Sequence, residues 1–350
     1  MTNAIRRRAA VRLICVVAIA GGAGTAARAA DAPPADAAAV RAAVARSLPL
    51  LATAARTSAE RRSGCFTCHN QGAPIQAMAA AAARGFAVDR EVLKAQAKFT
   101  ADFLGRNRAN YLEGQGQGGQ AHTAGYALWA LENAGWQPDE TTAAVAEYLL
   151  QFEKEADHWR PQSSRPPTQR SHFATSYVAL RGLERFGTAV QQERIKRRRA
   201  QVRAWLRAAA AKDTEDRVFR LLALRLTGAA AADVAAAADD LRRTQRPDGG
   251  WAQLESMPSD AYATATALFA LREAGGLTVA DPADRAGVRF LLAAQLPDGS
   301  WHVATRSEPL QKYYESGYPH GKDQFISVAA AGWATTVLAM TVPEPGAAAP

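Results

Sequence analysis

QRPDGGW at residues 245–251 returns fifty residues later as QLPDGSW at residues 295–301. In both copies Asp-Gly forms a tight turn, because glycine adopts backbone angles that other residues avoid. The Trp that follows the turn can pack its ring against neighbouring helices. A degenerate copy runs from Gln151 to Trp159. We therefore interpret these connections as structural links between helices and not as catalytic loops.

The segments that lie between such connections repeat one pattern. AHTAGYALWALENAG at 121–135, SHFATSYVALRGLERFG at 171–187 and SDAYATATALFALREAG at 259–275 each start with a polar or capping residue. Each continues with small residues and an aromatic along an apolar stripe, and each ends at Gly, which is typical of a helix end. Three more segments fit this pattern loosely, at 73–86, 214–228 and 323–339.

Six segments with more charge alternate with these six, and the alternation decides the architecture. β-branched residues are sparse and no period-two alternation is sustained, so the sequence predicts an all-α chain. We expect an (α/α)6 toroid of six helical hairpins, in which Ala, Gly and Thr let six inner helices pack around one axis. The charged outer segments lie at 36–55, 89–104, 140–153, 191–210, 231–244 and 282–295.

The Gln-Trp connections resemble the repeats of the squalene–hopene cyclase, oxidosqualene cyclase and protein prenyltransferase superfamily, over about residues 70–340. The resemblance implies the α/α toroid of that superfamily. Its class II cyclases protonate an alkene or epoxide with the middle Asp of Asp-x-Asp-Asp-Thr-Ala, and the matching position here reads Asp260-Ala-Tyr-Ala-Thr-Ala265. Tyr262, with an ordinary pKa near ~10, cannot replace that acid. Cyclase or isomerase activity is therefore the least favoured function, and Asp260 is expected to cap its helix.

The zinc site of the prenyltransferases, built from Asp, Cys and His, is not reproduced. Cys65 and Cys68 lie far in sequence from Asp260 and His320. Aromatic residues on the inner helices could instead line an apolar pocket for an isoprenoid or another lipid, or they could simply fill the core. These residues are Tyr126, Trp129, Tyr177, Tyr262, Phe269 and Trp333.

Residues 1–29 have the pattern of a secretory signal peptide. Four arginines within residues 6–12 precede a short apolar core, and Ala27-Arg28-Ala29 matches a signal-peptidase site. The mature chain is expected in the periplasm, without a transmembrane segment. Loss of this peptide removes Cys15 and lowers the net charge from +9 to +4, because the peptide holds five arginines and no acid. We therefore expect no nucleic-acid partner, and we interpret the basic run at 194–203 as a solvated helix face.

GCFTCHN at 64–70 holds both cysteines that remain in the mature chain. Cys-x-x-Cys-His in an exported protein is the attachment signature of c-type haem. Cys65 and Cys68 have the spacing that forms thioethers with the two haem vinyl groups, and His69 would bind the iron as the proximal ligand. The alternatives are a redox Cys-x-x-Cys, a structural disulfide, and a zinc site that needs a fourth ligand.

The second ligand of the iron is expected on the same rim of the ring. All outer-to-inner connections of an alternating ring emerge on one rim, and ring closure makes the second and sixth connections neighbours of the first. We expect His320, in the long sixth connection, or His122, at the start of the helix after the second connection; His302 is a third candidate. Polar residues of the sixth connection could instead surround an open iron, namely Tyr313, Tyr314, Glu315, Lys322 and Asp323.

A haem on this ring points to two functions. Two strong axial ligands favour electron transfer, with a redox partner protein or a quinone-like isoprenoid near the haem edge. An open iron favours a peroxidase- or oxygenase-like reaction on an apolar substrate, and a non-catalytic lipid or peptide binder is a third alternative. No catalytic residue is singled out. The expected organisation is a signal peptide at 1–29, an outer helix with the haem-attachment loop at 30–72, the toroid at 73–340 and a disordered tail at 341–350.

Overall fold

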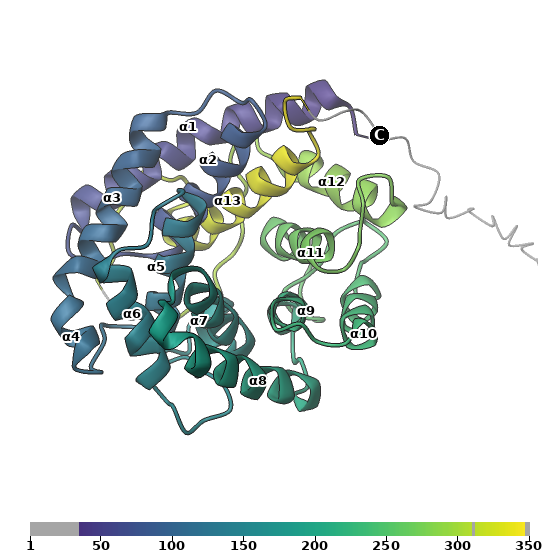
Figure 1. Ribbon diagram of the computed structural model, residues 1–350. Coiled ribbons are helices and arrows are strands. Elements are labelled where there is room, and N and C mark those ends of the chain that lie inside the picture. Colours follow the sequence, from purple (N-terminus) through teal and green to yellow (C-terminus); the bar gives the residue numbers. More distant parts are fainter. Residues whose placement is uncertain (1–34, 310–311, 347–350) are drawn as a thin grey trace, which may run out of the picture.

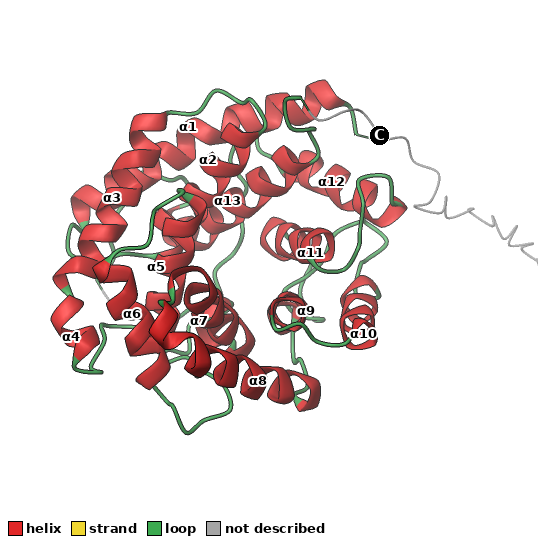
Figure 2. Ribbon diagram, viewed as in Figure 1, coloured by secondary structure: helices red, strands yellow, loops and turns green. Residues whose placement is uncertain are grey.

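The computed structural model describes residues 35–309 and 312–346, and no β-strand occurs among them. Their helices alternate between an outer and an inner layer around one axis (Figure 1), and loops of unequal length join them (Figure 2). The chain is therefore an all-α toroid, as predicted. The outer helices are α1 (Ala37–Arg61), α3 (Arg90–Arg106), α6 (Glu140–Gln151), α8 (Gln192–Ala208), α10 (Ala231–Arg242) and α12 (Pro282–Ala294). The inner helices are α2 (Ala73–Ala83), α5 (Gln120–Asn133), α7 (His172–Phe186), α9 (Thr214–Leu226), α11 (Ala261–Glu273) and α13 (Gln324–Met340).

The inner helices are buried on almost every side, which their small residues allow. In α11 every residue from Ala261 to Leu271 is buried. Inner helices α13 and α2 pack together although they lie at opposite ends of the chain. A Cβ atom on Gly332 of α13 would lie 2.7 Å from the Cβ of Ala73 in α2, so glycine is required for this approach. Close packing of small residues thus closes the inner layer.

The connection between α10 and α11 shows how the Gln-Trp pattern works. Gln245 Nε2 donates to the carbonyl of Gly249 within the turn (2.9 Å) and to the carbonyl of Ala283 in α12 (2.8 Å). Trp251 is fully buried, and its Nε1 donates to the carbonyl of Leu241 in α10 (3.0 Å). The pattern therefore links one hairpin to the next, which confirms its structural interpretation.

The second copy of the pattern closes the outer layer. Gln295 Nε2 donates to Gly299 (3.0 Å) and to Ala43 of α1 (2.9 Å), and buried Trp301 donates to a carbonyl of α12 (2.8 Å). Gly299 has φ +89°, and a Cβ there would lie 2.7 Å from the carbonyl oxygen of Arg46. The last connection of the chain is thereby fastened to its first helix.

The degenerate copy keeps half of this arrangement. Trp159 is buried and donates to a carbonyl of α6 (3.0 Å), like its two counterparts. Gln151 instead donates to Glu147 of its own helix (2.8 Å). Arg198 of α8 takes over the link to the next hairpin, because its Nη1 donates to the carbonyl of Ala156 and its guanidinium lies 4.0 Å from the centroid of the Trp159 ring.

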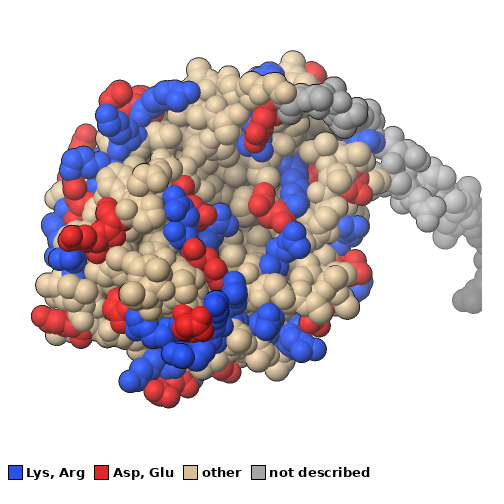
Figure 3. All heavy atoms as spheres, in the orientation of Figure 1, with Lys and Arg blue, Asp and Glu red and all other residues tan. Residues whose placement is uncertain are grey.

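The basic run on α8 lies among acidic side chains. Figure 3 shows Lys and Arg gathered over this part of the molecule, with Asp and Glu between them. Arg194 pairs with Glu147 (2.6 Å) and Arg199 pairs with Glu184 (3.1 Å). Much of the positive charge on this face is therefore locally balanced.

The two ends of the chain differ from expectation in part. The helix α1 extends six residues beyond the predicted end at 55 and forms the outer helix of the first hairpin. It is long and apolar enough to cross a membrane, but 44% of its apolar window is buried in the ring. The predicted signal peptide lies outside the described residues. At the other end, where a disordered tail was expected, Val342 is buried and the exposed Glu344 pairs with Arg84 (3.5 Å).

Candidate functional site

A cavity of about 610 Å³ lies between the inner helices on the axis of the ring. Its walls come from α2, α5, α11 and α13 and from the first, third and sixth outer-to-inner connections. The exposed lining residues Glu308, Lys312 and Lys322 mark its open side. This volume is typical of a site for a small molecule or cofactor.

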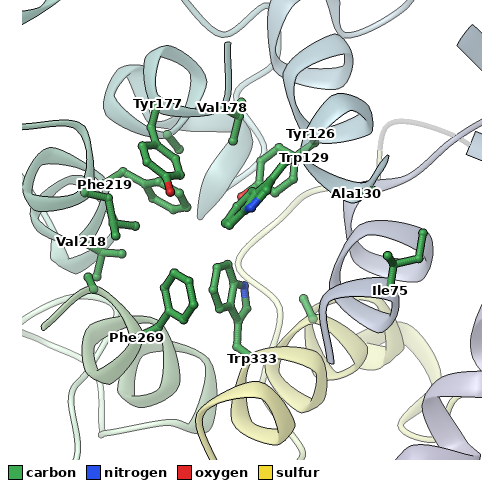
Figure 4. Packing of buried hydrophobic residues seen from close by; sticks show 14 of the residues in the cluster. Ile75, Tyr126, Trp129, Ala130, Tyr177, Val178, Val218, Phe219, Phe269 and Trp333 are labelled. Carbon is green, nitrogen blue, oxygen red and sulfur yellow. The ribbon is translucent and has the colours of Figure 1, made fainter. Parts of the chain in front are cut away.

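Aromatic rings from four inner helices meet at the centre of the ring (Figure 4). The ring centroid of Trp129 in α5 lies 5.6 Å from that of Trp333 in α13 and 5.5 Å from that of Tyr177 in α7. Phe269 of α11 packs on Trp333 at 5.0 Å. Of the predicted aromatic residues, Tyr126, Trp129, Tyr262 and Trp333 line the cavity, whereas Tyr177 and Phe269 lie in the core behind it.

The Cys-x-x-Cys-His motif lies at the wall of this cavity. Cys68 and His69 begin a short π-helix, Cys68–Gly72, that leads into α2, and both line the cavity. The His69 ring packs edge-on against Phe325 of α13 at 5.3 Å, and its Nδ1 lies 3.9 Å from Sγ of Cys68. Cys65 is half-buried and lies just outside the lining, and both cysteines are free thiols. The structure thus brings two of the three motif residues to the cavity.

Hydrogen bonds shape this loop but do not saturate it. Thr67 caps the π-helix by accepting from the backbone N–H of Asn70 (3.3 Å), and its own N–H donates to Gln71 Oε1 (2.9 Å). Asn70 Nδ2 donates to the hydroxyl of Tyr314 in the sixth connection (3.1 Å). Asn70 Oδ1, Gln71 Nε2 and Gln76 Nε2 are nevertheless buried without a hydrogen-bond partner. Each such atom costs about 1–3 kcal/mol, and of the three residues only Gln76 lines the cavity.

Burial sets the protonation of the motif. Burial, and then the charge of Arg165, lowers the pKa of His69 to about 3. The imidazole is therefore neutral at neutral pH, which is the form that binds a metal. Burial raises the pKa of Cys68 to about 11, against the opposing effect of Arg165. A thiol held protonated differs from the activated thiolate of a redox Cys-x-x-Cys.

His122 is buried one helical turn from the cavity wall. Its Nδ1 lies 3.1 Å from Oγ1 of Thr175, and its ring centroid lies 4.9 Å from that of Tyr126, which lines the cavity. Its Nε2 is buried without a hydrogen-bond partner. Burial, followed by the charge of Arg165, lowers the pKa of His122 to about 3. This side chain is thus a neutral imidazole with one nitrogen unused.

His320 does not join His69 at the cavity. Its Nε2 lies 2.9 Å from Oγ of Ser300, and its ring centroid lies 4.8 Å from that of His302. Residues 305–309 and 312–314 of the long sixth connection line the cavity. His320, later in the connection, instead contacts Ser300 of the Gln-Trp turn. In the part of the chain that the structure describes, no three His, Cys, Asp or Glu side chains group as a metal site would require.

A buried carboxyl group behind Tyr262 is a feature that we did not predict. Glu215, in the first turn of α9, is buried and accepts a hydrogen bond from the Tyr262 hydroxyl (3.2 Å). Burial, and then the neighbouring carboxyl of Asp213, raises the pKa of Glu215 well above its usual range. Asp260 caps α11 as predicted, accepting from a backbone N–H of the first turn (2.9 Å). The sequence signal for Glu215 is the acidic run 213–216, which helix capping explains equally well.

No protein-family model and no curated protein matches the sequence. Solved structures of a type II terpene cyclase, MstE from Scytonema, match the fold. The apo cyclase has a TM-score of 0.58 at 16% identity, over 88% of this chain and 99% of that chain. A variant in complex with geranylgeranyl dihydroxybenzoate (substrate) has a TM-score of 0.55 at 16% identity, over 87% and 99%. A variant with merosterolic acid A (product) has 0.52 at 15% identity, over 84% and 99%. The likeness shows a terpene cyclase-like toroid.

Proposed function

We propose that this chain is an exported c-type haem protein on a terpene cyclase-like toroid, with a role in electron transfer. The observation that carries the proposal is the position of Cys68 and His69 on the wall of the axial cavity. Cys65 and Cys68 would hold the haem through thioethers, and His69 would bind its iron. Haem supplies one-electron redox chemistry when bound.

The residues around the motif fit such a group. The lining combines aromatic rings with two guanidinium groups, Arg165 and Arg306, and each has a buried nitrogen without a hydrogen-bond partner. Haem has the same two-sided chemistry, an apolar macrocycle with carboxylates on one edge, and guanidinium pairs well with carboxylate. His69 is neutral and would contribute a nitrogen ligand. The residues of the Cys-x-x-Cys-His motif and the lining of the cavity are thus suited to haem.

For the second iron ligand we favour His122 over His320, which reverses the order expected from loop length. The Nε2 of His122 has no partner, whereas that of His320 is engaged by Ser300. We expect His122→Gln to convert a low-spin ferric spectrum to a high-spin one, and the matched variant His320→Gln to leave it low-spin. The reverse result would restore His320 as the ligand.

The proposed setting is the periplasm, which rests on the sequence pattern of residues 1–29. The proposed partners are a redox protein and an apolar small molecule such as an isoprenoid. The apolar ligand is supported by the aromatic lining of the cavity and by the fold, since the cyclase of the same fold binds geranylgeranyl dihydroxybenzoate.

A second candidate function is supported by Glu215. A buried carboxyl with a raised pKa keeps its proton at neutral pH and can act as a general acid. Tyr262 lies between Glu215 and the cavity and donates to Glu215 in this structure. For a relay its hydroxyl would turn to the cavity, give its own proton to the substrate and take a proton from Glu215. This function is acid-assisted isomerisation or cyclisation of an isoprenoid. It predicts activity that Glu215→Gln abolishes and that Cys65→Ser/Cys68→Ser leaves intact.

The test is expression of the full chain in a periplasm with haem-maturation machinery, followed by an optical spectrum of the oxidised and reduced protein. The proposal predicts a covalent c-type spectrum that is absent in Cys65→Ser/Cys68→Ser and unchanged in the neighbouring control Ser63→Ala. A low-spin ferric form supports electron transfer, and a high-spin form that binds carbon monoxide favours chemistry at an open iron. A folded wild-type protein without covalent haem would refute the proposal.

A further inference from the structure

Two connections from opposite parts of the ring meet over the cavity. The third connection contributes residues 165–169 to the lining, and the sixth contributes residues 305–309. They are joined by a hydrogen bond from Ser307 Oγ to the carbonyl of Pro166 (2.7 Å). The two segments carry Arg165 and Arg306, one from each side of this junction.

Neither guanidinium group has an acidic partner within 4.0 Å among the described residues. Arg165 Nε is buried without a hydrogen-bond partner, and no hydrogen bond from its side chain is present in the described part of the chain. Arg306 donates from Nε to Gln253 Oε1 (2.8 Å), but its Nη2 is buried without a partner. A guanidinium in this state has hydrogen-bonding capacity that only a further group can use.

The charges on the lining favour an anion. Four cationic side chains line the cavity against one carboxylate: Arg165, Arg306, Lys312 and Lys322 against Glu308. The aromatic rings of Trp129 and Trp333 form an apolar region of the same cavity. A molecule that satisfies both parts has an apolar body and an anionic head.

We propose that Arg165 and Arg306 form a carboxylate-binding site over the axial cavity, for a ligand with an apolar body and a carboxylate head. The planar guanidinium matches carboxylate in two-point hydrogen bonding, which favours a carboxylate over a rounder anion. The carboxylate comes either from a haem propionate or from a free apolar acid. The first source rests on the proposed function, and the second does not.

The first experiment uses the full chain produced without haem-maturation machinery. Isothermal titration calorimetry compares geranylgeranoic acid with geranylgeraniol, which differ only in the head group. The wild type should bind the acid at least about ten-fold more tightly. Arg165→Gln should remove that preference and leave the affinity for the alcohol unchanged, and Arg165→Lys should keep part of it. Arg199→Gln, on the outer helix α8, is the matched control and should change neither affinity.

The second experiment repeats the titration on the haem-loaded chain and distinguishes the two sources. If propionates occupy the site, the preference for the acid disappears and Arg165→Gln shifts the midpoint potential of the haem. If a free acid is the ligand, the preference persists. A chain that leaves the haem-loading periplasm without covalent haem and still prefers the acid would refute the proposed function and leave the carboxylate site standing.

Three results would overturn the carboxylate site. The first is equal affinity of the haem-free wild type for acid and alcohol. The second is an Arg165→Gln variant that weakens both ligands alike, which would indicate a packing role. The third is no binding of either ligand together with a haem potential that Arg165→Gln leaves unchanged. Arg165 is the variant of choice because its side chain holds no other part of the fold, whereas Arg306 supports Gln253.

Discussion

The first outer-to-inner connection of this ring and the Gln-Trp turn of the last one use their polar side chains differently. In the last connection, Gln295 donates twice and Trp301 donates once, all to backbone carbonyls. In the first connection, Asn70 and Gln71 each keep a buried polar atom without a partner. The polar side chains of the Gln-Trp turn at 295–301 therefore fasten the fold, whereas Asn70 and Gln71 each keep a polar atom that no described residue uses.

The largest effect on stability is expected from the Gln-Trp turn of the last connection. Trp301→Ala removes a fully buried indole and its hydrogen bond to α12, which should cost about 3–5 kcal/mol of unfolding free energy. Chemical denaturation of the haem-free chain measures it. Trp301→Phe keeps most of the packing and should cost clearly less. A loss below about 1 kcal/mol for Trp301→Ala would mean that this connection does not fasten the ring.

A smaller loss is expected from the turn itself. Gly299→Ala places a side chain at φ +89° and brings its Cβ within 2.7 Å of the Arg46 carbonyl, at a cost of about 2–3 kcal/mol. Gly276→Ala is the matched control, because Gly276 has φ +70° and open space around it. It should show backbone strain alone, about 1–2 kcal/mol. Equal losses in the two variants would show that the close contact of Gly299 with α1 does not contribute to the cost of the substitution.

The buried Glu215, which contacts Tyr262 at the cavity, should make the unfolding free energy depend on pH. The raised pKa of Glu215 means that the folded state holds a proton that the unfolded state has lost above its ordinary pKa, so this contribution to stability falls as pH rises. Glu215→Gln should therefore make the unfolding free energy fall less steeply between pH 5 and 8, by up to about 1.4 kcal/mol per pH unit. Glu184→Gln, at the ion pair with Arg199, is the control. An unchanged slope in Glu215→Gln would show that this carboxyl is ionised in the folded protein.

The smallest effect on stability is expected from the motif. Cys65→Ser/Cys68→Ser should change the unfolding free energy of the haem-free chain by less than about 1 kcal/mol, because neither thiol holds another element in place. Denaturation curves recorded beside those of Trp301→Ala provide the comparison. A loss as large as that of Trp301→Ala would show that the two cysteines stabilise the fold as much as the Gln-Trp turn does.

The fold was predictable because its signals are local and repeated. The turn Pro-Asp-Gly, the Trp that follows it and the alternation of charged and small-residue helices each specify one hairpin, and six hairpins specify a ring. The role of Gln295 required the structure, since its partner Ala43 lies at the other end of the chain. Repeats thus predict the architecture better than they predict the contacts between the last hairpin and the first.

The site was predictable only where one short motif carries the chemistry. Cys65, Cys68 and His69 are adjacent in sequence, so their proximity needs no fold. His320 was expected from the length of its loop, but that length is used to cover the cavity. Arg165, Arg306 and Glu215 come from three distant segments. The unpartnered nitrogens of the two arginines and the burial of Glu215 are visible only when those segments are packed together.

The most direct test of the central claim is a peptide map of the chain purified from a haem-loading periplasm. Trypsin cleavage after Arg62 and Arg84 releases the peptide 63–84 with both cysteines and His69. If haem is attached to Cys65 and Cys68, this peptide carries the added mass of one haem and neither cysteine reacts with a thiol reagent. Two alkylatable thiols, or a Cys65–Cys68 disulfide, in that peptide would contradict it.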